Sequence, residues 1–330
     1  MKIGIVTPAP PRSRYGNRLT AVRWAGILRR LGHRASIIQA YEGEAYGLLV
    51  ALHARRSYPS IRRFHLDHPE CPLLVALTGT DLYKDLPGSR RARQSLELAT
   101  RLIVLQPKAS EALPPHLRPK VRVIYQSVSR GSGFGIRGPG KDAKPNPNPV
   151  SRGRSFDVVV IGHLRPVKDP FRTARAVRQL PLSSGVRVLH LGAAMDEAMA
   201  RRARAEMRVN PRYLWLGEQP HWRVQQILRS SKLCVLSSKL EGGANVVSEA
   251  IVAGVPLLVS RIPGSMGLLG ESYSGYFRVG DTKGLAQLLR RTETDPSLLS
   301  KLRSHCRKLV PLFDPGGEKT AWDRLLQELI

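Results

Sequence analysis

The sequence predicts an α/β protein built from two parallel sheets, each covered by helices on both faces. Short apolar segments alternate with amphipathic segments on either side of residues 129–155, where the alternation stops. Such alternation is typical of doubly wound sheets, because parallel strands need crossover connections. At 330 residues the chain is long enough for two domains of ordinary size.

The first domain, residues 1–128, begins with a buried-strand pattern at 2–6. A helix is expected at 18–31, where apolar residues recur at helical spacing before Gly32. Short apolar runs predict further strands at 35–39, 47–52, 73–77, 101–105 and 121–125. Functional groups are expected where these strands end and, above all, in the cleft between the domains.

Residues 129–155 hold six glycines, four prolines and six basic residues, and they are expected to form a flexible linker. The second domain, 156–312, resumes the alternation. Its strands are expected at 156–161, 186–191, 213–216, 233–236 and 256–260. Its helices are expected at 169–180, 196–207, 221–229 and 244–253. The C-terminal 50 residues are mostly helical in pattern, and 313–330 is expected to pack back toward the first domain.

The net charge is +28, so nucleic-acid binding has to be weighed. The excess arginines are scattered and aromatic residues make up only 6%, which favours a solvated surface or attraction of small anions. A non-catalytic polyanion-binding protein stays open. There is no signal-peptide pattern and no apolar run of spanning length, and the three cysteines are widely spaced. These features predict a cytoplasmic protein without stable membrane association.

Glu241 and Glu249 flank a glycine pair at the start of a predicted helix. A helix N-terminus presents unpaired N–H groups that attract phosphate, and Gly242 and Gly243 let an anion approach the backbone closely. The two carboxylates could accept hydrogen bonds from sugar and ribose hydroxyls. An ordinary loop-to-helix junction with solvent-facing glutamates is the alternative.

The spacing Glu241-(seven residues)-Glu249, followed by the sequence AIVAGVP, resembles a signature of retaining GT-B glycosyltransferases of the GT4-like class. The resemblance implies two doubly wound domains that face each other across a cleft. It also implies that Glu241 contacts the transferred sugar and that Glu249 holds the ribose. The backbone that would bind the diphosphate comprises Gly242, Gly243, Ala244 and Asn245.

A second donor element of that family is a Gly-Arg-Leu segment with a lysine four residues beyond the leucine. Here the chain reads GHLRPVK over 162–168, so Lys168 matches while His163 departs from the usual arginine. Arg165 could supply the second cation. Lys168 and Arg165, with Glu241, are therefore the expected catalytic residues, since two cations would neutralise the departing diphosphate. Surface positions are the alternative for both cations.

Several further segments together resemble the selenosugar synthase (SenB) family of selenoneine biosynthesis. They are TPA at 7–9 with GNR at 16–18, ALHARRS at 51–57, LTGTDL at 77–82, IYQS at 124–127 and IPGSMGLLG at 262–270. This resemblance implies transfer of N-acetylglucosamine from UDP-N-acetylglucosamine to selenophosphate, which forms a carbon–selenium bond. A GT4-like enzyme with a hydroxyl acceptor, such as a lipid-linked sugar, and a UDP-N-acetylglucosamine epimerase remain alternatives.

The acceptor is expected to bind the strand-end loops of the first domain, where cations and hydroxyls converge. The residues expected to bind it are Gly16, Asn17, Arg18, His53, Thr78, Gly79, Thr80 and Asp81, with Arg12 and Arg14 nearby. Each arginine could instead be a solvated surface residue, and His53 a packing histidine. A selenium nucleophile ionises readily, so no general base is required. No cofactor and no metal are expected, because no Asp-x-Asp pair or histidine spacing suggests a metal site.

Overall fold

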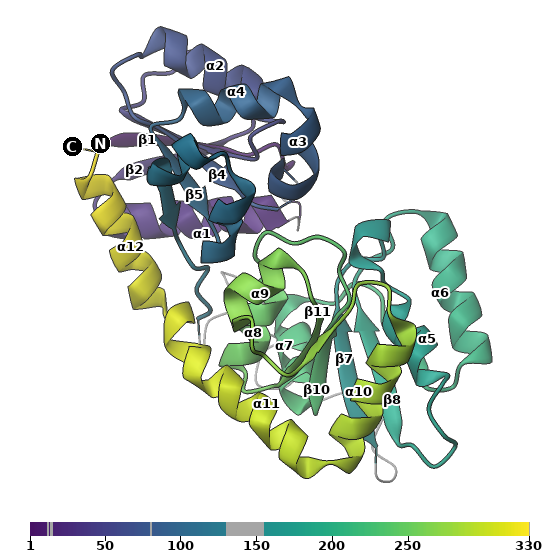
Figure 1. The fold of residues 1–330 in the computed structure, drawn as a ribbon. Helices are drawn as coiled ribbons and strands as arrows, with labels where there is room; N and C mark the ends of the chain where they lie inside the picture. Colours follow the sequence, from purple (N-terminus) through teal and green to yellow (C-terminus); the bar gives the residue numbers. More distant parts are fainter. Residues whose placement is uncertain (12, 14–15, 80, 130–154, 330) are drawn as a thin grey trace, which may run out of the picture.

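The computed structural model describes residues 1–330 except 12, 14–15, 80, 130–154 and 330. Most of the predicted linker therefore lies outside the described residues. Two domains are stacked in Figure 1, and each is built on a six-stranded parallel sheet. The predicted α/β class is confirmed.

The N-terminal sheet has the strand order β2-β1-β3-β4-β5-β6. Its strands are β1 (Lys2–Val6), β2 (Arg34–Ile38), β3 (Leu48–Leu52), β4 (Leu73–Leu77), β5 (Arg101–Val104) and β6 (Val121–Val123). Its helices are α1 (Gly16–Arg30), α2 (Tyr58–Asp67), α3 (Leu86–Gly88) and α4 (Arg90–Leu98). β3 and β4 share the sequence LLVAL and are wholly buried, as strands covered on both faces must be. Alternate β3 residues accordingly fall into different core clusters, with Leu49 on one face and Leu48 on the other.

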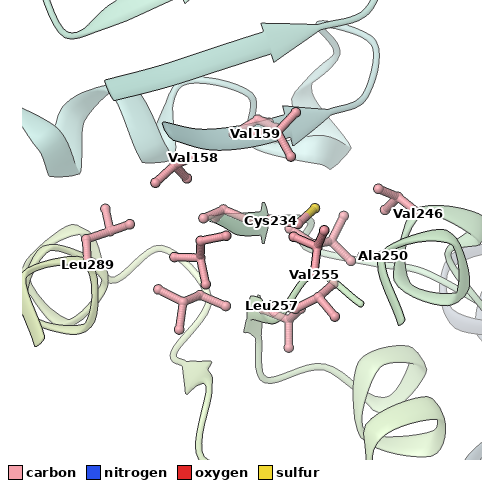
Figure 2. Packing of buried hydrophobic residues seen from close by; sticks show 14 of the residues in the cluster. Val158, Val159, Cys234, Val246, Ala250, Val255, Leu257 and Leu289 are labelled. Carbon is pink, nitrogen blue, oxygen red and sulfur yellow. The ribbon is translucent and has the colours of Figure 1, made fainter. Parts of the chain in front are cut away.

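The C-terminal sheet has the order β12-β11-β10-β7-β8-β9. Its strands are β7 (Phe156–Ile161), β8 (Val186–Leu191), β9 (Tyr213–Trp215), β10 (Leu233–Leu236), β11 (Leu257–Ser260) and β12 (Tyr276–Phe277). Its helices are α5 (Arg172–Val177), α6 (Glu197–Val209), α7 (His221–Ser230), α8 (Asn245–Val252), α9 (Pro263–Leu269) and α10 (Thr282–Thr294). Figure 2 shows the core around Cys234 of β10, where Val159 of β7 and Ala250 of α8 converge.

Some elements differ from the sequence-based expectation. The helix expected at 169–180 forms only over α5, because Asp169 adopts a left-handed backbone with φ 44° and Pro170 follows it. The strand expected at 121–125 ends at Val123. A π-helical turn at Asp81–Asp85 was not expected; its first residue, Asp81, accepts hydrogen bonds from the amides of Gly79 and Ala54.

The last two helices connect the domains. α11 (Pro296–Leu309) and α12 (Pro315–Gln327) run along one side of the molecule, and α12 lies against the N-terminal domain (Figure 1). There Trp322 packs edge-on against Trp24 of α1, with ring centroids 5.0 Å apart. Between α11 and α12, the Phe313 carbonyl accepts a hydrogen bond from the Val128 amide at 3.0 Å, at the end of the N-terminal domain. Among the described residues, no helix combines the length and apolar character needed to cross a bilayer.

Candidate active site between the domains

The loop between β10 and α8 touches the N-terminal domain through its glycines. A Cβ added to Gly242 would lie 2.6 Å from the backbone N and Cα of Gly79. One added to Gly243 would lie 2.7 Å from the Leu105 Cβ. Neither position has room for a side chain, so the predicted diphosphate loop sits directly against the loops that follow β4 and β5.

Lys168 and Glu241 meet beside this loop. The Lys168 Nζ forms an ion pair and hydrogen bond with Glu241 Oε1, and the two side chains are 19% and 13% exposed. Two contacts fix the segment that carries Lys168: the Lys239 amide donates to the Val167 carbonyl at 2.8 Å, and Ser237 Oγ donates to the Asp169 carbonyl at 3.0 Å. The lysine is thereby held at the edge of the glycine loop.

Three polar atoms on this loop, on the first residue of α8 and on the segment that carries Lys168 are buried and have no hydrogen-bond partner in the described part of the chain. They are Ser238 Oγ, Asn245 Oδ1 and Arg165 Nε. Buried polar atoms are nearly always paired, so each is suited to a bound polar ligand. His163 Nδ1, by contrast, accepts a hydrogen bond from the Ala193 amide at 3.0 Å, which orients its ring.

A small pocket lies at the carboxyl ends of β7, β8 and β10. Its polar lining comes from Gly162, Lys168, His190, Ser237 and Ser238. Burial lowers the pKa of His190 to about 4, so this imidazole is neutral. Its Nδ1 lies 2.9 Å from Tyr213 Oη and its Nε2 3.1 Å from the Gly162 carbonyl. His190 therefore supports the loop that follows β7 and carries no charge to a ligand.

Glu249 lies on α8 and is half-buried. Gln225 of α7 donates through Nε2 to Glu249 Oε2 at 3.2 Å. Burial raises the pKa of Glu249 to about 7, while the positive charge of Arg23 and the Gln225 hydrogen bond act in the opposite direction. The sequence analysis did not identify Gln225 or Arg23 as residues that influence Glu249. Arg23 belongs to α1 of the other domain, and the one signal in the sequence was a basic residue inside a mostly apolar helix segment.

Asp81 organises the loop that faces Gly242. It is fully buried; its Oδ1 accepts from the Gly79 amide at 2.8 Å and its Oδ2 from the Ala54 amide at 3.2 Å. Gly79 has φ 151°, in the region that glycine tolerates best. Thr78 and Gly79 thus lie against the glycine loop, whereas Thr80 lies outside the described residues.

His53 follows β3 with φ 78°, a left-handed backbone that is uncommon outside glycine. Its Nδ1 accepts from the Arg56 amide at 3.4 Å, and its Nε2 lies 3.6 Å from Asp85 Oδ2. Burial lowers the pKa of His53, which favours the neutral ring. Arg55 Nε also lies 3.0 Å from Asp85 Oδ2, so this cation already has a carboxylate partner.

Gly16, Asn17 and Arg18 form the first turn of α1, and Arg12 and Arg14 lie outside the described residues. The structure thus gathers Lys168, Glu241 and residues 242–245 at one place, with Thr78 and Gly79 opposite them. The roles assigned to these residues stay predictions. Within the described part of the chain, no three His, Cys, Asp or Glu side chains gather as metal ligands would.

Comparison with known proteins places the C-terminal half in a family. The sequence model described as "Glycosyl transferases group 1" matches residues 144–309. A glycosyltransferase 1 domain-containing protein from Xenopus tropicalis is 23% identical over 325 residues, covering 91% of this chain and 90% of that protein. N-acetyl-alpha-D-glucosaminyl L-malate synthase from Bacillus anthracis is 26% identical over 154 residues, which is 46% of this chain and only 40% of that protein.

A solved structure of similar fold is Anabaena HepE in complex with UDP and glucose. It superposes with a TM-score of 0.75 at 16% identity, over 99% of this chain and all of that one. The expected GT-B arrangement of two facing doubly wound domains is therefore confirmed.

Proposed function

The chain belongs to the group 1 glycosyl transferases, and from that premise we propose that it transfers N-acetylglucosamine from UDP-N-acetylglucosamine to selenophosphate. The observation that carries the donor half of the proposal is the Lys168–Glu241 pair beside the side-chain-free loop at Gly242 and Gly243. A cation, a carboxylate and helix-start amides that no side chain caps fit a diphosphate joined to a sugar.

The unpaired atoms at this site support a nucleotide-sugar donor. With the donor bound, Lys168 and Arg165 contact the diphosphate and Asn245 takes a polar group at the start of α8. Glu241, released from Lys168, accepts hydrogen bonds from sugar hydroxyls, and Glu249 accepts them from the ribose. A UDP donor agrees with the fold shared with HepE, whose structure contains UDP and glucose.

The reaction needs a nucleophile that attacks the anomeric carbon while UDP departs. A selenium lone pair forms the C–Se bond as the bond from C1 to the diphosphate oxygen breaks, and that electron pair leaves with UDP. Lys168 and Arg165 stabilise the growing negative charge. Since the selenium is already ionised, no side chain has to remove a proton, which agrees with an Asp81 carboxylate that is occupied by the Gly79 and Ala54 amides.

A small hydroxy acid is the second candidate acceptor. The Bacillus anthracis relative is named for joining N-acetylglucosamine to malate, a small dianion that presents a hydroxyl. Both candidates require cations in the N-terminal domain. Arg18 is one such cation, since it stands at the start of α1, whereas Arg55 is already paired with Asp85.

The test measures UDP release from UDP-N-acetylglucosamine with selenophosphate, thiophosphate, phosphate, malate or water, and identifies each product by mass spectrometry. We expect selenophosphate to be fastest and to yield a selenium-linked sugar. Arg18→Ala should raise the KM for that acceptor without changing UDP affinity. Preference for malate would favour the second candidate, and release no faster than with water would refute both acceptors.

A further inference from the structure

The short helix α9 packs against the N-terminal domain beside the candidate active site (Figure 1). Gln106, which precedes the 3₁₀ turn η2 (Pro107–Ala112), is fully buried there. A Cβ added to Gly267 of α9 would overlap Gln106 Oε1, so this amide occupies the space that a side chain at 267 would need. Just beyond the end of α9, Glu271 forms an ion pair with Lys108 of η2. The N-terminal domain therefore contacts this segment at two points.

The first turn of α9 lies against the loop that carries Glu241. A Cβ added to Gly264 would overlap the Glu241 carbonyl oxygen and would lie 3.3 Å from the Glu241 Cβ. The next residue along the loop, Gly242, meets the backbone of Gly79. The segment at 241–242 thus has one close contact with α9 and another with the loop that follows β4, so its backbone has little room to shift.

Gln106 is joined to the same part of the N-terminal domain as Gly79. Its Nε2 donates a hydrogen bond to Tyr83 Oη at 3.1 Å. Tyr83 belongs to the π-helical turn at 81–85, and the Asp81 carboxylate of that turn accepts from the Gly79 amide at 2.8 Å. One turn of the N-terminal domain therefore holds two residues that contact the other domain, Gln106 against α9 and Gly79 against the loop of Gly242.

Packing alone does not account for an amide at position 106. Gln106 Oε1 is buried and has no hydrogen-bond partner among the residues that the structure describes, and an unpaired buried carbonyl is costly. A leucine would fill a similar volume without that cost. The amide differs from a leucine in its hydrogen bond to Tyr83, which fixes the direction of the side chain toward Gly267.

We propose that Gln106 is a positioning residue for the sugar-transfer step. Held by Tyr83, it sets the place of α9, and α9 sets the backbone of Glu241. This inference rests on the proposed function, in which Glu241 contacts the transferred sugar. Because UDP carries no sugar, displacement of Glu241 slows the transfer and leaves the binding of UDP unchanged.

The experiment measures, on the full chain, kcat with the acceptor that releases UDP fastest and the affinity for UDP by calorimetry. Gln106→Ala should lower kcat at least about tenfold, the order of loss that small misplacements of reacting groups cause, without changing UDP affinity. Tyr83→Phe removes only the hydroxyl that holds the amide, so it should lower kcat by a smaller factor with the same unchanged affinity. Gln327→Ala, at an exposed position of α12, is the matched control and should alter neither quantity.

A double-mutant cycle tests whether Gln106 acts through Glu241. Where Glu241→Gln has already removed the carboxylate, adding Gln106→Ala should lower kcat by less than about threefold, because residues that act as a unit are not additive. Losses that multiply would overturn the inference, as would an unchanged kcat in Gln106→Ala or an equal loss of UDP affinity. If Gln106→Ala does not fold, Tyr83→Phe takes its place in the same cycle, with the same outcomes. No UDP release by the unmodified protein would instead refute the proposed function, and this inference with it.

Discussion

At the scale of the residue, Glu249 links the proposed chemistry to pH. Burial raises its pKa to about 7, against the opposing effects of Arg23 and Gln225. The charge of Glu249 also acts on the buried Cys234, whose pKa is raised mainly by burial. Near neutral pH, Glu249 is therefore the one of these two groups that changes charge.

The first prediction follows from that titration. The ionised carboxylate accepts more strongly from ribose hydroxyls, so UDP affinity should rise with pH through about 7 and fall below it. The terminal phosphate of UDP also titrates, near pH 6. The measurement is therefore the ratio of UDP affinities between the natural protein and Glu249→Gln from pH 6 to pH 8. A ratio that does not change with pH would rule out a ribose contact by this carboxylate.

The second prediction concerns Lys168. A cation aimed at the leaving diphosphate acts chiefly in the transition state, so Lys168→Ala should lower kcat about 10²–10³-fold and change the donor KM less. Lys239→Ala is the control, because Lys239 is exposed and anchors the loop through its backbone amide alone. Steady-state kinetics on both variants would settle the point, and an unchanged kcat would place the diphosphate elsewhere.

At the scale of the element, the loop that carries Gly242 and Gly243 packs directly against the loop that follows β4. Gly242 and Gly79 touch through their backbones, so the second domain's predicted donor loop has its place set by the first domain. Side chains elsewhere in the two loops can then approach a ligand from opposite sides.

The third prediction tests that contact. Gly242→Ala puts a Cβ 2.6 Å from the Gly79 backbone, so the loops must separate. We expect turnover to fall at least about tenfold, the order of loss that small misplacements of reacting groups cause. Gly317→Ala on α12 meets nothing within 4 Å and serves as the control. Full turnover by Gly242→Ala would mean that the loops need not touch during catalysis.

Most strands and helices could be predicted from the sequence, because the pattern that specifies each of them is local. Buried runs such as LLVAL and the helix start after Gly243 carry their own patterns, so strands and this loop-to-helix junction could be predicted from the sequence. The contacts of the residues expected to bind the acceptor could not be predicted in the same way. The Arg55 guanidinium is paired with Asp85, which belongs to the unexpected π-helical turn at 81–85, so the local sequence around Arg55 does not reveal this partner. The effect of the Arg23 charge on the pKa of Glu249 was missed for the same reason, because the two residues belong to different domains.

At the scale of the whole molecule, a buried carboxylate on α12 holds this helix against the N-terminal domain. Glu318 of α12 is buried, and its Oε1 accepts from Trp24 Nε1 at 3.0 Å. Its Oε2 accepts from the Ser127 amide at 2.9 Å and the Ser127 hydroxyl at 2.5 Å. The Glu318 carboxylate therefore links three segments: α12, α1 and the chain at Ser127, where the N-terminal domain ends.

The fourth prediction is that Glu318→Ala destabilises the protein by about 3–5 kcal/mol. Three buried donors would lose their acceptor at once, and unpaired buried polar groups are costly. Lys319→Ala, at the exposed neighbouring position, is the control and should change the free energy of unfolding by less than about 0.5 kcal/mol. Denaturant unfolding of both variants measures the difference. A loss below about 1 kcal/mol would mean that the packing of Trp24 against Trp322, rather than this carboxylate, holds α12 on the first domain.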